Sequence, residues 1–345
     1  MLMELYEKIP VPLKTEHNWR YSEYSFFVKD EEPTTFVDIN SSISNIHKSD
    51  IFEPLVVKNP EKIGVYNLIK SQEKFSFDID KSGMYFIELK MLGKYNVVRE
   101  QIRIREDLDV DLVFTIEDGN KESVNNNCLE LLVEKNSKVR IFFDHNLKQS
   151  FSHSLIYFDM KDNTDVKVAF LTNNPKYEKT HIKGLINGSN SKYVVFMLAR
   201  VDGLDHVDYR TENIHIKPGS ESLSVYRSIV DGRARSIYTG MLRIEKEAKF
   251  SNAYQNSRNI LLSDKARVET IPELEILNQE VACTHGAVVS SLDEEAIYYF
   301  MSRGVSRQEA IKLITDGFLL DKLEDNLGPN LYPIVYNKVT NDEYS

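Results

Sequence analysis

Short apolar runs separated by polar turns dominate the chain from about residue 60 to residue 290. Residues 138–143 (KVRIFF), 166–171 (VKVAFL) and 193–198 (YVVFML) are examples, and all three are rich in the β-branched and aromatic residues that favour strands. The 3.6-residue periodicity of an amphipathic helix is scarce in this region. We therefore expect a mainly β structure built from many short strands.

A small residue recurs in the turns between these runs at a nearly constant spacing. The positions are Ser137, Thr164, Ser191, Ser220, Ala248 and Ala266, and the successive steps are 27, 27, 29, 28 and 18 residues. Repeats of this length, made of short strands, are typical of solenoids in which each unit buries its apolar face against its neighbours. A parallel β-helix fits best, and a β-sandwich of similar strands is the alternative.

The pattern becomes helical after residue 291. Acidic residues in the first turn and Gly304 as a stop signal predict a helix over residues 293–303. Ser306 and Glu309 form a capping box for a second helix, which Gly317 would end, and a third short helix is predicted from Phe318. We expect this helical hairpin to cap the open end of the strand stack, where exposed strand edges would otherwise favour aggregation.

Three regions follow from these patterns. Residues 1–45, which hold the single tryptophan, are predicted to form an N-terminal arm packed on the solenoid. Residues 46–290 would form the β-helix core, and residues 291–345 the C-terminal helical domain. The stretch from Gly328 onward is polar and contains two prolines, so we expect it to be a loosely held tail.

Charge and composition narrow the range of functions. The 345 residues carry a net charge of −10, and the basic residues are scattered among acids, which argues against a nucleic-acid partner. No run of 18 apolar residues is present, and the first residues lack the pattern of a secretory signal, so we expect a cytoplasmic protein without a membrane partner. The phosphate-binding loop G-x-x-x-x-G-K-[ST] is absent, and we expect no nucleotide hydrolysis by this chain.

Cys283 and His285 form the most informative pair of side chains. They stand two positions apart in a strand-like run, and a strand directs residues i and i+2 to the same face. A thiol beside an imidazole suits a soft-metal or cluster ligand site, or a nucleophile with its base. The alternative is a buried cysteine that packs as a small hydrophobe. Cys128 is the only other cysteine, so a cluster here would need ligands from elsewhere.

Six motifs occur in a fixed order in the C-terminal half. They are residues 233–240 (RARSIYTG), 253–263 (AYQNSRNILLS), 271–276 (IPELEI), 281–287 (VACTHGA), 297–304 (IYYFMSRG) and 309–318 (EAIKLITDGF). Together they resemble the C-terminal half of the SufB/SufD family, the scaffold subunits of the SUF iron–sulfur cluster assembly system. Residues 16–22 (EHNWRYS) are also similar to the N-terminal segment of SufD-type members. The resemblance implies a right-handed parallel β-helix followed by a helical C-terminal domain.

The resemblance also implies partners and a cofactor. Members of the family form a complex with the ABC-type ATPase SufC, which docks on the C-terminal helices, and pair with a second SufB/SufD-type chain through their β-helices. An iron–sulfur cluster, transient and shared with the partner chain, would form near that interface. For the SufC contact we single out Glu294, Glu295, Tyr298, Phe300 and Phe318, because the two helices need apolar surface for a partner.

Two positions separate the two subunit types. SufB-type members carry a cysteine at the place of Ser257 and a glutamate at the place of Gly286, whereas this chain has the Cys-x-His-Gly-Ala of SufD-type members. The resemblance therefore makes the chain SufD-like, with His285 as the candidate iron ligand and Cys283 as a weaker one.

Two other functions stay open at this point. One is a homodimeric scaffold of the SufB type, and the more distant one is a polysaccharide-active enzyme on a β-helix. Such an enzyme would need two carboxylates at a fixed separation. The tight acidic cluster Asp202, Asp205 and Asp208 is typical of a turn instead.

Overall fold

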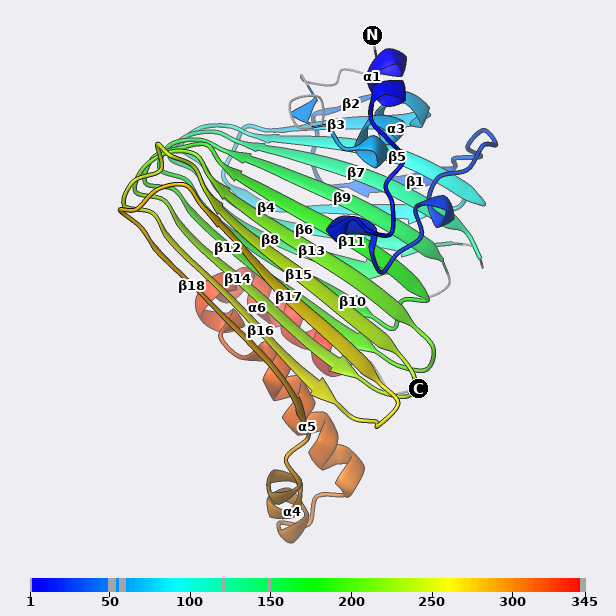
Figure 1. The fold of residues 1–345 in the computed structure, drawn as a ribbon, viewed down its shortest axis with the longest axis vertical. Helices are drawn as coiled ribbons and strands as arrows, with labels where there is room; N and C mark the ends of the chain where they lie inside the picture. The colour runs from blue at the N-terminus through cyan, green and yellow to red at the C-terminus, as the bar shows by residue number, and fades with distance from the viewer. Residues whose placement is uncertain (1, 49–53, 56–59, 120–121, 148–149, 342–345) are drawn as a thin grey trace.

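The protein is a parallel β-solenoid of about seven turns with helices at its C-terminal end (Figure 1). The computed structural model describes residues 2–48, 54–55, 60–119, 122–147 and 150–341. One sheet runs in the order β1-β4-β6-β8-β10-β12-β14-β16-β18 and the other in the order β17-β15-β13-β11-β9-β7-β5-β3-β2. The chain therefore alternates between the two sheets and places one strand of each in every turn. The predicted parallel β-helix is confirmed, and the sandwich alternative is wrong.

The strands are β1 (Val37–Ser41), β2 (Ile46–Lys48), β3 (Glu73–Ile79), β4 (Gly83–Met91), β5 (Tyr95–Ile104), β6 (Asp109–Asp118), β7 (Val124–Val133), β8 (Lys138–Asn146), β9 (Phe151–Met160), β10 (Asp165–Asn173), β11 (Tyr177–Ile186), β12 (Lys192–Val201), β13 (His206–His215), β14 (Glu221–Val230), β15 (Arg235–Ile244), β16 (Asn252–Leu261), β17 (Arg267–Ile276) and β18 (Ala282–Ser291). The helices are α1 (Leu2–Lys8), α3 (Lys62–Lys70), α4 (Glu294–Ser302), α5 (Arg307–Leu320) and α6 (Leu323–Asn341), with short 3-10 turns η1 (His17–Trp19) and η2 (Tyr24–Phe26).

The small-residue repeat marks the turns that enter one of the two sheets. Ser137, Thr164, Ser191 and Ser220 directly precede β8, β10, β12 and β14, and the backbone of each turn bonds to the next, as in Asp165 N to Ser137 O at 3.0 Å. The last two positions of the repeat were wrongly assigned. Ser251 occupies the place given to Ala248, because Asn252 N bonds to Ser220 O, and Ala266 precedes β17 in the other sheet. The apparent final step of 18 residues therefore mixes the two sheets.

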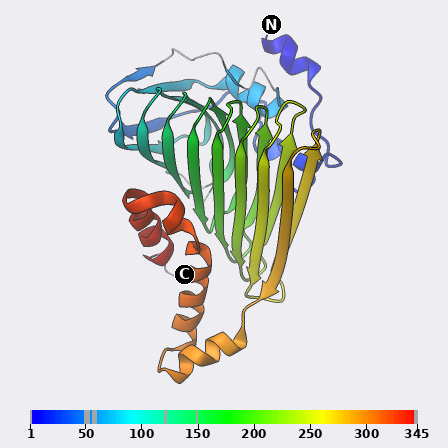
Figure 2. The ribbon, with the colours of Figure 1, turned by 90° about the vertical axis from the view of Figure 1, so that its left-hand side faces the viewer.

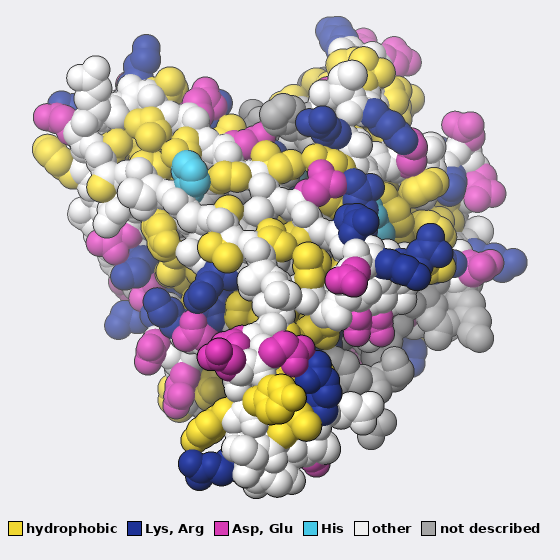
Figure 3. All heavy atoms as spheres, turned by 60° about the horizontal axis from the view of Figure 1, so that its bottom comes forward, with side chains coloured by type: hydrophobic (Ala, Val, Ile, Leu, Met, Phe, Trp, Pro, Cys, Tyr) yellow, Lys and Arg dark blue, Asp and Glu magenta, His cyan; other side chains and the backbone are white. Residues whose placement is uncertain are grey.

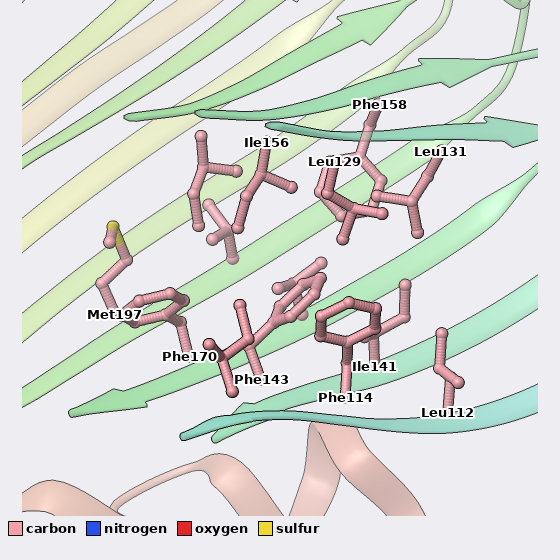
Figure 4. Packing of buried hydrophobic residues seen from close by; sticks show 14 of the residues in the cluster. Leu112, Phe114, Leu129, Leu131, Ile141, Phe143, Ile156, Phe158, Phe170 and Met197 are labelled. Carbon is pink, nitrogen blue, oxygen red and sulfur yellow. The ribbon is translucent and has the colours of Figure 1, made fainter. Parts of the chain in front are cut away.

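The core lies between the two sheets. Figure 4 shows the side chains of Leu112, Phe114, Ile141 and Phe143 directed toward those of Leu129, Leu131, Ile156 and Phe158 on the opposite sheet. The interior becomes polar in the later turns. Its inward-facing side chains there include Thr211, Asn213, His215, Ser222, Ser224, Ser228 and Ser236, all of which are buried. Many of them bond across the interior, as in Asn213 Nδ2 to Ser224 Oγ at 2.9 Å.

At the N-terminal end of the solenoid the chain covers its own first parallel strands. β1 pairs antiparallel with β4, and β2 pairs antiparallel with β3, so that the first parallel strands are covered at their edges. Residues near the N-terminus pack on the outer face of the second sheet. The ring of the buried Trp19 stacks on His153 at 5.8 Å, and Ser22 Oγ donates to Asp208 at 2.6 Å.

The C-terminal helices do not cap the open end, so that prediction is wrong. α5 and α6 lie on the outer face of the first sheet, against β6, β8, β10 and β14, and Figure 2 shows them beside the strand stack, with α4 below the strand ends. Ion pairs hold them there, including Arg200 to Asp316 at 2.7 Å. The predicted capping box at Ser306 is present, and Asp293, which was predicted as the first residue of its helix, is the N-cap of α4. Gly317 does not end α5, because the helix continues to Leu320.

The prediction of a loose tail from Gly328 is also wrong for the residues up to 341; residues 342–345 lie outside the described residues. α6 buries an apolar stripe at four-residue spacing, formed by Leu323, Leu327, Leu331, Val335 and Val339. The helix is interrupted at Gly328, whose φ of 68° lies in the left-handed region. Pro329 follows directly, at the start of the second half of the helix, where its missing N–H has no helical partner to lose.

Candidate functional site at the open end of the solenoid

The C-terminal end of the solenoid is open. Within the part of the chain that the structure describes, β17 and β18 each pair on one side only and end the two sheets. The side chains of β18 are largely solvent-exposed, and those of β17 are exposed or partly exposed; Val288, for example, is 50% exposed. Leu274, Ile276, Leu277 and Val289 are further exposed apolar residues at this end. In Figure 3, where the bottom of the molecule comes forward, apolar side chains lie at the surface between charged ones. An uncovered apolar strand edge of this length is a template for pairing with another chain.

Cys283 and His285 both lie on β18, the last strand at this end. Cys283 contacts a small buried cluster that includes Leu242, Ile244 and Ala253, so its side chain faces the interior. Burial raises the pKa of the Cys283 thiol, which therefore stays protonated near neutral pH. His285 is two positions further along and faces the same side, but it is exposed at the mouth of the solenoid. The sequence correctly predicted that the two side chains share a face.

The two positions that separate SufB-type from SufD-type sequences face opposite sides of the sheet. Ser257 is buried on β16, and its Oγ accepts a bond from Asn259 Nδ2 at 3.0 Å. Gly286 lies on the outer face, where a Cβ atom would stand 3.3 Å from Asn256 Nδ2. A residue larger than glycine at position 286 would therefore contact the outer surface and not the interior.

The residues singled out for the ATPase contact fall into different environments. Glu294 pairs with both terminal nitrogens of Arg307 at 2.8 Å, and this bond lowers the pKa of the Glu294 carboxyl. Glu295 is exposed in the first turn of α4. Tyr298 is 70% exposed, whereas Phe300 is only partly exposed and meets Tyr299 edge-on at 5.9 Å.

Phe318 lies apart from the others. It packs against the outer face of the first sheet, its ring is 5.3 Å from the Arg227 guanidinium, and its carbonyl accepts a bond from Arg227. It therefore fixes α5 to the solenoid. Sequence reasoning missed two exposed residues of α4, Tyr299 and Met301. Their position beside Tyr298 on a short, strongly capped helix was the signal that could have identified them.

His153, His215 and Cys128 are buried, and His206 is partly buried. Burial lowers the pKa of His153 to about 3, and the pKa values of His206 and His215 to about 4. Burial also raises the pKa of Cys128 to about 12. Groups with these pKa values stay neutral at physiological pH, which suits core packing.

The acidic cluster is divided between two environments. Asp208 accepts bonds from Ser22 Oγ and from Lys179 Nζ, the latter at 2.8 Å, beneath the N-terminal segment. Asp205 lies in the turn before β13, and burial together with the nearby Asp202 raises its pKa to about 6. Asp208 is thus occupied by a structural ion pair, and it does not form a free carboxylate pair with Asp205.

Fold and site together define a class of protein: a parallel β-solenoid whose last strand carries an inward-facing cysteine and an exposed histidine, and is followed along the chain by a helix with exposed side chains. A family model described as "SUF system FeS cluster assembly, SufBD core domain" matches residues 90–318. The chain therefore belongs to the SufB/SufD family of the SUF iron–sulfur cluster assembly system, and it is SufD-like.

Several curated relatives are similar to this chain. The iron–sulfur cluster assembly protein SufD of Escherichia coli is 28% identical over 54% of this chain and 44% of its own length. SufD of Bacillus subtilis is 38% identical over 32% of this chain and 26% of its own, and SufB of the same organism is 29% identical over 39% and 29%. The matched stretches thus span less than half of each of these relatives. Among the described residues, no helix has the length and apolar character needed to cross a membrane.

Proposed function

We propose that this chain is a non-catalytic scaffold subunit of an iron–sulfur cluster assembly complex. In this proposal it pairs with a SufB-like chain through the open end of the solenoid and binds a SufC-like ABC ATPase through α4. ATP hydrolysis is supplied by that partner. His285 contributes one ligand to the iron of a nascent cluster, which is the cargo of the complex.

The observation that carries the proposal is the coincidence of three features at one end of the molecule. The last strand has an unpaired edge, that edge carries exposed apolar side chains, and His285 stands at the mouth between the sheets. A neutral imidazole is a good ligand for iron, and a thiolate-rich partner would supply the softer bonds. A histidine among thiolate ligands also changes the properties of a cluster and suits one that is later transferred. Cys283 plays the smaller part because its thiol faces inward and stays protonated.

The contact with the ATPase is supported by the surface of α4. Tyr298, Tyr299 and Met301 are exposed on a helix that projects from the body of the molecule (Figure 1). Exposed tyrosines are typical of the residues that dominate binding energy at protein interfaces. Glu294 supports the helix through its pair with Arg307 and is a less suitable contact residue.

The decisive experiment is His285→Ala in the complex co-expressed with its SufB-like and SufC-like partners. We expect the complex to assemble normally and to lose its capacity to form a cluster, measured as iron and sulfide per complex after anaerobic reconstitution. The matched control is Thr284→Ala, on the opposite face of the same strand. Normal cluster formation by His285→Ala would refute the proposal.

The homodimeric alternative is tested by the same preparation. Light scattering of the chain expressed alone and with the SufB-like chain distinguishes a self-dimer from a mixed pair. A stable self-dimer that forms clusters without the second chain would favour the homodimer.

A further inference from the structure

Gln255 occupies an unusual position beneath the candidate ligand. It lies on β16, directly opposite His285 in the parallel register, and its neighbours Ala253 and Ser257 on the same face are buried. Gln255 is 2% exposed, although the strand next to it is the last one of the sheet. Side chains at matched positions of neighbouring parallel strands lie about 4.8 Å apart at their bases. The amide of Gln255 is therefore within reach of the imidazole of His285.

The amide of Gln255 is also unpaired. Among the residues that the structure describes, neither Nε2 nor Oε1 has a hydrogen-bond partner. A primary amide offers two donors and an acceptor, and leaving a buried polar group unsatisfied destabilises the fold. The polar groups around it are paired: Asn259 Nδ2 donates to Ser257 Oγ, and Tyr238 OH bonds to Thr211 Oγ1 at 2.7 Å.

The opposite sheet makes room for this amide. Gly240 on β15 faces Gln255 across the interior, and a Cβ atom added there would lie 2.4 Å from Gln255 Oε1. Any other residue at position 240 would displace the amide from its place. The interior thus leaves space for the Gln255 amide, which lies on the strand next to His285 and has no hydrogen-bond partner among the described residues.

We propose that Gln255 is a positioning residue for His285. Its Oε1 accepts the N–H of the ring nitrogen that faces the interior, after a rotation of the His285 side chain, so that the other nitrogen presents its lone pair to iron at the open end. Histidine ligands depend on such a bond at the second nitrogen, which fixes the tautomer and the orientation of the ring. The inference rests on the proposed function of His285, because the bond matters only if that ring binds iron.

The first test needs only the isolated chain. The imidazole nitrogens of His285 are observed by ¹⁵N NMR and assigned by their loss in His285→Ala. We expect a single neutral tautomer in the native chain and a mixture in Gln255→Met, which fills a similar volume without an amide. Gln255→Leu gives a second, smaller replacement, and the backbone spectrum of each variant verifies its fold. The matched control is Asn256→Leu, which removes an amide from the opposite face of the same strand and should leave the tautomer unchanged.

The second test uses the assembled complex. Apparent affinity for ferrous iron, titrated anaerobically, should fall about 10- to 100-fold in Gln255→Met, the usual effect of removing the partner of a ligating histidine. The role of Gln255 would be overturned if both Gln255 variants kept the native tautomer and iron affinity while His285→Ala lost iron. That result would leave the function proposed for His285 intact. If instead Gln255→Met changed the tautomer but His285→Ala bound iron with normal affinity, the contact between Gln255 and His285 would be confirmed and the function proposed for His285 refuted.

Discussion

Replacing Leu331 by alanine should detach the last helix from the solenoid. Leu331 is 0% exposed and packs among the apolar residues between α6 and the outer face of the first sheet. A buried leucine-to-alanine change costs about 2–5 kcal/mol, because apolar contacts are lost and a cavity remains. Alanine favours helix at least as much as leucine does, so the loss reports packing and not helix propensity. We expect about 3 kcal/mol, which raises the open fraction of α6 on the order of 100-fold.

Hydrogen exchange followed by mass spectrometry measures this effect directly. Peptides that cover residues 323–341 should exchange faster in Leu331→Ala, while peptides from β5 to β13 keep their protection, because helix and solenoid open separately. The matched control is Leu313→Ala, the same change at a position of α5 that is 51% exposed, which should cost less than about 1 kcal/mol. Equal exchange of residues 323–341 in the native chain, Leu331→Ala and Leu313→Ala would refute the packing argument and restore the picture of a loose tail.

Three further predictions concern other parts of the molecule. Val288→Lys should weaken binding of a SufB-like chain at least about 10-fold, since a buried unpaired charge is costly, and analytical ultracentrifugation of the mixed pair measures it. Tyr298→Ala combined with Tyr299→Ala should reduce ATPase affinity by about 2 kcal/mol or more in calorimetry, whereas Glu295→Gln should change it little. His153→Gln should reduce the loss of unfolding free energy as the pH falls below 6.5. The pKa of His153 is about 3 in the folded state, so between pH 6.5 and pH 3 the unfolded chain binds a proton at this residue and the folded chain does not. The free energy of unfolding of the native chain therefore falls by up to about 1.4 kcal/mol per pH unit in this range. Urea titrations at pH 7 and pH 5 should show this loss in the native chain and a smaller one in the variant.

The sequence predicted the solenoid because its turns are regular. Each turn pairs its strands edge to edge with those of the turn before it, so small residues recur wherever the chain enters the sheet, as at Ser137 and Thr164. The regularity fails near Ala248, because the last turns are longer and β14 pairs Glu221 with Asn252. A pattern read from spacing alone could not detect that the series had changed sheets at Ala266.

The position of the helices was less predictable. The capping box depends on local residues, Ser306 and Glu309, and this prediction was correct. Whether a helix covers a sheet face or a sheet edge depends on residues far away in sequence. The outward-facing apolar residues of the first sheet, including Phe142, Leu171 and Phe196, receive the stripe of α6. The prolines of this stretch concealed that stripe, because Pro329 follows a break at Gly328 and begins a helix instead of ending one.

The sequence identified Cys283 and His285 as candidate site residues, but it did not identify the residues that surround them. The i, i+2 spacing placed Cys283 and His285 on one face, and strand geometry makes this independent of the rest of the fold. Gln255 gave no sequence signal, because its importance arises from the register of β16 with β18 and from the space left by Gly240. Only the paired sheets bring these three positions together.

The two ends of the solenoid differ in a way that bears on function. Any stack of parallel strands has two edges that can pair with other chains, and proteins usually cover both. Here short antiparallel strands, β1 and β2, cover the first parallel strands, while α5 and α6, which could have covered the last ones, pack on a sheet face instead. Because those helices bury an apolar stripe of their own on that face, the chain has gained stability without closing the last turn. The open edge is thus retained at the one turn that carries His285, and under the function proposed above a chain that pairs there would complete both the sheet and the ligand set.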